Sequence, residues 1–116
     1  MGSSGTGSFG DLKGSSESQM CLRSIKDDWL EEVARCDFFK TQGGVPSIMH
    51  PVHIHNSIVN GRIVVVSTST DEIIGLLPSS YSYLLGCMKK GHQYIGTVVH
   101  SVNTPIPKVM VNIDAV

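Results

Sequence analysis

Residues 62–102 read RIVVVSTSTDEIIGLLPSSYSYLLGCMKKGHQYIGTVVHSV, and their pattern decides the fold. An apolar run, a polar turn, a second apolar run, a helical pattern that begins at a proline, a glycine stop and a third apolar run follow one another with few spare residues. Ile63–Val66 is β-branched throughout, which is typical of a strand covered on both faces. The stretch therefore predicts a strand–strand–helix–strand unit.

The helix of this unit is predicted at about 78–90. Pro78 suits the first turn of a helix, and Gly91 follows the last turn as a stop. Lys89 and Lys90 fall in the last turn, where cations favour a helix C-terminus. An amphipathic stripe at helical spacing runs between these signals, made of Tyr81, Leu84, Leu85 and Met88.

Further strands are predicted on both sides of this helix. Glu72–Leu77 precedes it, with Gly75 marking a bulge or a close backbone approach. Gln93–Val102 and Lys108–Ile113 follow it, each with alternating apolar residues.

A hairpin is predicted before the unit, because Asn60-Gly61 is a strong two-residue turn signal. It pairs residues 52–59 antiparallel with residues 62–67. The resulting fold class is α+β: a small antiparallel sheet or barrel of about five strands, one amphipathic helix and a helix in the N-terminal segment.

The N-terminal segment of the domain, Cys21 to Lys40, fits two patterns. In the favoured one Ser24 caps a helix whose apolar face holds Ile25, Trp29, Leu30 and Val33. The competing one is a strand in Trp29–Phe39, and the sequence leaves it open.

Residues 1–20 are rich in Gly and Ser and predict a disordered tail, because they offer too little apolar surface to offset the entropy of ordering. The opening MGSSG is common in expression vectors, which favours a vector origin for part of this tail. Residues 21–116 then form a single α+β domain.

Charge and cysteine content bound the function. The net charge is −1, so no strongly basic face is predicted, and any contact with nucleic acid is local and short.

Cys21, Cys36 and Cys87 are odd in number and include no CxxC pair, which predicts neither a disulfide framework nor a zinc knuckle. We expect a reducing compartment, cytoplasmic or nuclear. The apolar runs are far too short to cross a membrane, so no membrane partner is predicted.

No catalytic motif is present, and we predict neither an enzyme nor a cofactor. The one cluster with metal-ligand chemistry is His50, His53 and His55, of which the last two share one side of a predicted strand. No acid follows until Asp71, and a complete site needs three or four ligands of fixed geometry. We therefore predict no metal, and a small metalloenzyme ranks as the third hypothesis.

A second cluster surrounds the end of the predicted helix and consists of Lys89, Lys90, His92 and Tyr94. Positive charge beside an aromatic ring can hold a phosphate and stack a base. The simpler interpretation is that two solvated lysines compensate the helix dipole.

Residues 62–102 resemble the C-terminal half of a HIRAN domain. That family shows a strand, a turn with an acidic residue, a Gly-bearing strand that ends in Leu-Pro, a helix with an apolar stripe, a Lys-Gly stop and a strand with alternating valines. The matching residues here are Ile63–Val66, Asp71–Glu72, Ile74–Pro78, Tyr81–Met88, Lys90-Gly91 and Tyr94–Val99. The Asn-Pro-x-Asp segment usual in the family is absent, and Asn56–Arg62 takes its place.

The resemblance implies a small β-barrel-like module that binds DNA, notably free single-stranded ends. With the basic cluster, it predicts a nucleic-acid-binding accessory module without chemistry of its own, and its candidate contacts are Asn60, Arg62, Lys89, Lys90 and Tyr94. The alternative is a protein–protein interaction or structural module without nucleic-acid binding, which uses an exposed edge strand or the Phe38-Phe39 segment.

Overall fold

The computed structural model describes residues 19–116, so the disordered tail predicted at residues 1–20 falls almost entirely outside the described residues. The strands are β1 (Ile25–Trp29), β2 (Pro51–Ile54), β3 (Val64–Ser67), β4 (Ile73–Leu76), β5 (Tyr94–Val102) and β6 (Lys108–Ala115). The helical elements are the 3₁₀ turns η1 (Val33–Arg35) and η2 (Ser79–Tyr81) and the α-helices α2 (Asp37–Gln42) and α3 (Leu84–Lys89).

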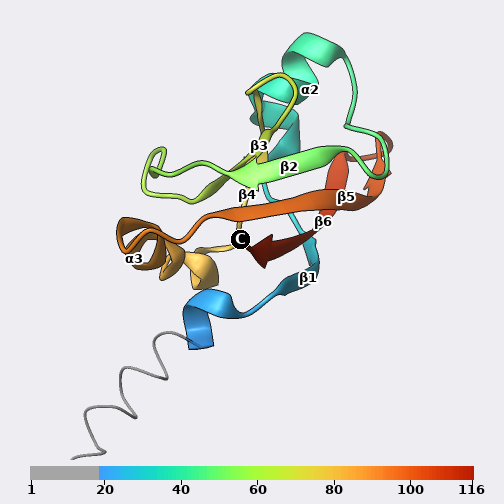
Figure 1. The fold of residues 1–116 in the computed structure, drawn as a ribbon. Coiled ribbons are helices and arrows are strands. Elements are labelled where there is room, and N and C mark those ends of the chain that lie inside the picture. Colours follow the sequence, from blue (N-terminus) through green and yellow to red (C-terminus); the bar gives the residue numbers. More distant parts are fainter. Residues whose placement is uncertain (1–18) are drawn as a thin grey trace, which may run out of the picture.

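The strands form one antiparallel, six-stranded sheet in the order β1-β6-β5-β2-β3-β4. The sheet curls into a half-barrel, with α2 at the top of the view in Figure 1 and α3 at the lower left. The predicted α+β fold class is confirmed. The alternative strand in Trp29–Phe39 is not formed, because η1 and α2 lie in that segment, and the strand β1 ends at Trp29.

The predicted hairpin is confirmed. Val52 pairs with Ser67 and Ile54 with Val65, and Val59 and Arg62 exchange two backbone hydrogen bonds of 2.9 and 3.0 Å. Asn60 and Gly61 lie between them with φ of 51° and 77°, the left-handed backbone that a type I′ turn requires.

The helix predicted from Ile25 onward is wrong, because residues 25–29 form the strand β1. β1 pairs with β6 at the other end of the sequence, and this pairing continues as Leu30 donates its N–H to the Val109 carbonyl at 2.8 Å. The helical spacing of the apolar residues is a local signal, and it gives no information about a partner strand so distant in sequence. Tertiary pairing overrides such a propensity.

A one-residue bulge in β1 decides which of its side chains face the barrel interior. Ile25 pairs with Ile113 and Asp28 with Val111, so β1 uses one residue more than β6 over the same distance. Strict alternation from the buried Ile25 would turn Trp29 inward and Leu30 outward. The bulge reverses this, and Leu30 is 6% exposed while Trp29 is 39% exposed.

The two edge strands of the sheet meet just after β1. Glu31 donates its N–H to the Leu76 carbonyl at 2.7 Å and accepts the Leu76 N–H at 3.0 Å. The Arg62 side chain braces this seam, with Nη2 2.5 Å from Glu31 Oε1 and 2.6 Å from the Leu77 carbonyl oxygen. The seam joins β1 to β4 and encloses the core.

The core is aliphatic and draws on every strand and on α3. Its fully buried members include Ile25, Val52, Val65, Ile74, Leu84, Val98, Val109, Val111 and Ile113. The helix predicted at about 78–90 is present as η2 and α3, and Leu84 and Cys87 are its buried residues.

Cys87 forms a disulfide with Cys21, so the prediction of no disulfide was wrong. The partners are 66 residues apart in sequence, and only the fold brings them together. Cys36 is a free, buried thiol. Burial, together with the negative charges of Glu32 and Asp37, raises its pKa above the usual value.

Gly75 in β4 allows Leu30 to lie directly against the strand. A Cβ at Gly75 would be 2.7 Å from Leu30 Cβ and 3.2 Å from Val33 Cγ2. The close approach predicted at Gly75 is confirmed, and the β3–β4 pairing is also irregular between Val65 and Val66.

Gly75→Ala is expected to lower the free energy of unfolding by roughly 1–3 kcal/mol, because the new methyl group overpacks a well-filled core. Urea denaturation measures the change. The control is Gly86→Ala in α3, where a Cβ meets no atom within 4 Å, and it is expected to raise stability by about 0.5–1 kcal/mol. A loss of stability in the control, or none at Gly75, would contradict this interpretation.

Candidate nucleic-acid interface

An exposed aromatic side chain marks one surface of the sheet. The Trp29 ring meets the edge of the His100 ring with centroids 5.7 Å apart, and Lys108 Nζ lies 5.7 Å from the centre of the Trp29 ring. Trp29, Met110 and His100 are register partners on β1, β6 and β5, so they form a row across three strands. We call Trp29, His100, Lys108 and Met110 the Trp29 surface.

A second bulge, in β5, places His100 in this row. Val98 pairs with Val111 and His100 with Met110, so Val99 has no register partner in β6. Alternation from the buried Val98 would turn His100 toward the core, but the bulge leaves His100 exposed. Bulges commonly re-aim side chains next to functional sites, and here two of them converge on one surface.

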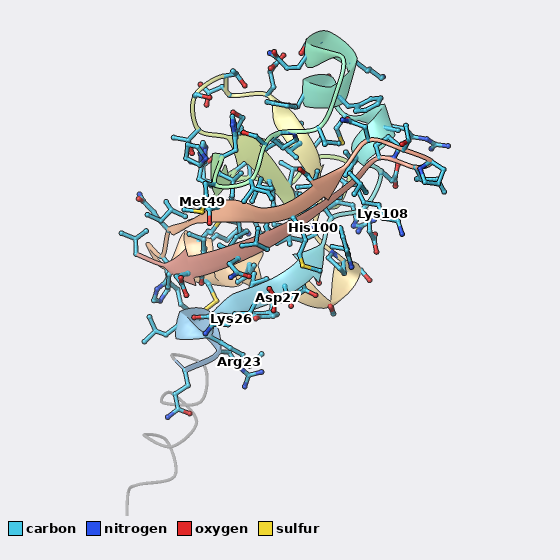
Figure 2. The ribbon with its side chains drawn as sticks, turned by 90° about the vertical axis from the view of Figure 1, so that its right-hand side faces the viewer. Arg23, Lys26, Asp27, Met49, His100 and Lys108 are labelled. Carbon is cyan, nitrogen blue, oxygen red and sulfur yellow. A yellow bond between two sulfur atoms is a disulfide. The ribbon has the colours of Figure 1, made fainter. Side chains whose placement is uncertain are left out.

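Basic side chains extend the Trp29 surface along β1. Figure 2 shows Lys108 and His100 together at one end of the sheet, with Lys26 and Arg23 farther along β1 and before it. Arg23, Lys26 and Lys108 are all exposed. Figure 2 also shows the acidic side chain of Asp27 beside Lys26.

The carboxylate of Asp28, next to Trp29, is engaged in a structural contact. The Tyr81 hydroxyl donates a hydrogen bond to Asp28 Oδ2, which ties β1 to η2. This bond, with burial and the Asp28 charge as smaller causes, raises the pKa of Tyr81 to about 12.

The candidate contacts that the sequence predicted do not come together. Arg62 braces the seam described above, and Asn60 is exposed at the tip of the β2–β3 hairpin. Lys89 and Lys90 are exposed at the end of α3. Tyr94 is 2% exposed, and its hydroxyl donates to the Cys21 carbonyl at 2.7 Å, so its ring offers no free face for stacking.

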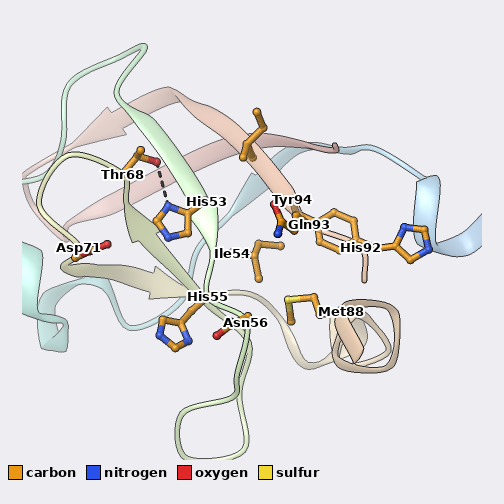
Figure 3. Close-up of a pocket in the computed structure, with 11 residues that line it drawn as sticks. His53, Ile54, His55, Asn56, Thr68, Asp71, Met88, His92, Gln93 and Tyr94 are labelled. Atoms are coloured by element: carbon orange, nitrogen blue, oxygen red, sulfur yellow. Dashed lines mark hydrogen bonds between the residues drawn. The ribbon is translucent and has the colours of Figure 1, made fainter. Parts of the chain in front are cut away.

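A pocket of about 610 Å³ lies between β2, β5 and the end of α3. Figure 3 shows polar side chains around an apolar floor that includes Ile54 and Met88. The polar residues that line it are His53, His55, Asn56, Thr68, Asp71, His92 and Gln93. This is a concave site of the size that small ligands occupy, but no Lys or Arg lines it.

The three histidines of the sequence cluster take separate partners. His50 Nε2 is 2.7 Å from Ser67 Oγ, and His53 Nδ1 is 3.1 Å from Thr68 Oγ1. The Ser57 N–H donates to His55 Nδ1 at 3.2 Å. Within residues 19–116, no group of three His, Cys, Asp or Glu side chains is placed to hold a metal ion.

Sequence reasoning missed the Trp29 surface for two reasons. It predicted a helix over Trp29, and simple alternation along β5 from Val98 would turn His100 inward, whereas the bulge turns it outward. The available signal was Asp27-Asp28 before Trp29, because Asp tolerates the left-handed backbone that Asp27 adopts with φ of 53°.

Comparisons with protein-family models, curated proteins and solved structures find no match to this chain. Among the helices that the structure describes, none has the length and apolar character needed to span a membrane.

Arg62→Gln is expected to lower the free energy of unfolding by roughly 1–3 kcal/mol, because it removes charge-assisted hydrogen bonds to Glu31 and to the Leu77 carbonyl. Urea denaturation measures this loss. Arg35→Gln is the matched control. Arg35 pairs with Glu32 at 3.7 Å on the exposed surface, and its loss should change stability by less than about 0.5 kcal/mol. Equal effects would show that Arg62 does not brace the seam.

Asp28→Asn is expected to return the pKa of Tyr81 from about 12 toward the ordinary value of about 10. Because folding raises this pKa, the stabilisation from the bond is complete below about pH 10 and is lost as the pH rises toward 12. Ultraviolet titration of tyrosinate absorbance measures the shift, and Tyr81→Phe identifies which part of the curve belongs to Tyr81. Superimposable wild-type and Asp28→Asn curves would refute the assignment.

Proposed function

We propose that this domain is an accessory module that binds single-stranded nucleic acid, with single-stranded DNA ends as its ligand, and that it carries out no chemistry of its own. The proposal agrees with the resemblance of residues 62–102 to a HIRAN domain. The observation that carries it is the Trp29 surface, where an exposed indole is flanked by an imidazole and by basic side chains.

The chemistry of this surface fits an unpaired strand. A base stacked on an aromatic side chain contributes about 1–3 kcal/mol, and such stacking requires a base that is free of its neighbours in a duplex. Lys108 lies over the Trp29 ring and is exposed, so a base can displace it toward the adjoining phosphate. Arg23 and Lys26 extend the positive charge away from Lys108, along β1 and before it.

The charge of the domain sets the strength of binding. Contacts from Arg23, Lys26 and Lys108 would neutralise about three phosphates. A plot of log Kd against the logarithm of the salt concentration is then expected to have a slope of about 2. Such a module binds weakly and locally, in keeping with the net charge of −1.

Trp29 is the single tryptophan of the chain, so its own fluorescence reports on stacking. Titration with oligothymidine should quench this fluorescence and raise the anisotropy of a labelled strand in parallel. Trp29→Ala should weaken binding by roughly 5- to 150-fold, the equivalent of one stacked base. Blunt duplex should bind less tightly than a single strand or a 3′ overhang, and a circular single strand should bind less tightly than a linear one.

Lys108→Gln tests the basic component, with Lys40→Gln as a matched control that removes one exposed lysine on α2. The Lys108 variant should lower the salt slope by about 0.7, and the Lys40 variant should leave it unchanged. Flat quenching and anisotropy curves at high micromolar protein, or equal effects of the two variants, would reject the proposal.

The alternative is a protein-interaction module, and one observation favours it. Ile48, Met49 and Ile106 are large apolar side chains on the surface, and Met49 is 69% exposed. The two features that the sequence suggested for this role are less accessible, because the seam joins the edge strands at Glu31 and Phe38 is buried in the core. Absence of oligonucleotide binding, with reversible self-association in sedimentation, would favour this alternative.

A further inference from the structure

The Cys21–Cys87 disulfide joins the beginning of the described chain to α3. Cys21 lies in a helical turn at residues 19–22, directly before β1, and Cys87 lies on the buried face of α3. Both residues are 4% exposed. A cleft of about 220 Å³ beside them, lined in part by Met20, Tyr83 and Lys90, gives solvent access to this part of the surface.

Hydrogen bonds also tie the segment before β1 to the rest of the described chain. The Cys21 carbonyl accepts the Tyr94 hydroxyl, and Ser24 Oγ donates to Asp114 Oδ1. The side chains on either side of Cys21, Met20 and Leu22, are exposed and contribute little burial. The disulfide is the one covalent link in this set.

Within the first half of β1, Ile25 is buried and pairs with Ile113, whereas Lys26 and Asp27 are exposed. β1 is an edge strand there, because β6 is its neighbour and the contact with β4 begins only at Glu31. The bulge interrupts its pairing between Ile25 and Asp28, where the Asp27 N–H donates to the Asn112 side chain at 2.7 Å instead. Residues 19–27 are therefore held by the disulfide to α3, by the buried Ile25 and by the hydrogen bonds named above.

We infer that the Cys21–Cys87 disulfide is a redox-sensitive clamp that fixes residues 19–27 on the barrel. When it forms, the two thiols lose two protons and two electrons to a disulfide oxidant such as oxidised glutathione, which leaves as two molecules of reduced glutathione. When reduced glutathione reverses the reaction, the segment detaches from α3 while the seam at Glu31 keeps the barrel closed.

The third cysteine does not compete for either partner. Cys36 lies in the link between η1 and α2, and its thiol contacts the Glu32 carbonyl at 3.2 Å. Burial and neighbouring carboxylates disfavour its thiolate, which is the reactive form in disulfide exchange. The pairing of Cys21 with Cys87 is therefore specific.

The clamp has a consequence for binding, and this part alone rests on the proposed function. Arg23 and Lys26 lie within the clamped segment, whereas Lys108 and His100 lie on the β5–β6 hairpin. Reduction should therefore remove the basic extension of the Trp29 surface and leave the aromatic row in place.

Limited trypsin digestion of the full chain tests the clamp without any nucleic acid. The oxidised protein should resist cleavage after Arg23 and Lys26, and reduction with excess reduced glutathione should accelerate both cleavages by roughly tenfold or more. Cleavage after Lys108 serves as the internal reference and should not change. Mass spectrometry of the fragments assigns each site.

Variants separate the clamp from general destabilisation. Cys21→Ser and Cys87→Ser should each reproduce the reduced pattern under oxidising conditions, with cleavage after Lys108 unchanged. Cys36→Ser keeps the disulfide and should behave as the oxidised wild type.

Two results would overturn the inference. One is equal cleavage after Arg23 and Lys26 in both redox states. The other is three titratable thiols in protein that has been denatured after equilibration with oxidised glutathione. Failure of oligonucleotide binding would reject the proposed function and leave both readouts of the clamp unaffected.

Discussion

Leu30 lies against the backbone of Gly75, and Glu31 beside it exchanges two hydrogen bonds with Leu76. This contact joins the first strand of the sheet to the last in sheet order. A Cβ at position 75 would lie 2.7 Å from Leu30 Cβ, so the close packing of Leu30 on β4 requires a glycine there. Arg62 adds charge-assisted hydrogen bonds at the same place, so a basic residue that resembles a ligand contact is used to close the barrel.

The sequence predicted the parts of the fold that depend on neighbours in the chain. Asn60-Gly61 has one favourable turn geometry, and the stripe of α3 repeats over consecutive turns, so both features are visible locally. β1 is different, because its partner strand lies at the far end of the sequence. The Cys21–Cys87 disulfide was missed for the same reason.

The candidate site was less predictable than the fold, because the exposure of a side chain depends on which face of its strand it occupies. Counted from the buried Ile25 and Val98, alternation would turn Trp29 and His100 inward, and a bulge turns each of them outward. Tyr94 shows the converse case. Its position after the two lysines suggested a stacking contact, but the first position of β5 faces inward, and its hydroxyl finds a backbone carbonyl there. Residue type indicates which chemistry is available, and the alternation of side chains along each strand decides which residues face solvent.

β1 is anchored at both ends by interactions of different kinds. At its start, a covalent bond to α3 holds Cys21, and it responds to the redox state of the surroundings. At its end, the packing of Leu30 and the hydrogen bonds of Glu31 hold the strand, and neither responds to thiols. Trp29 is adjacent to the second anchor, whereas Arg23 and Lys26 are close to the first. Under the proposed function, stacking and charge on this face would depend on different anchors, and a change in redox state would alter the salt dependence of binding more than the contribution of the stacked base.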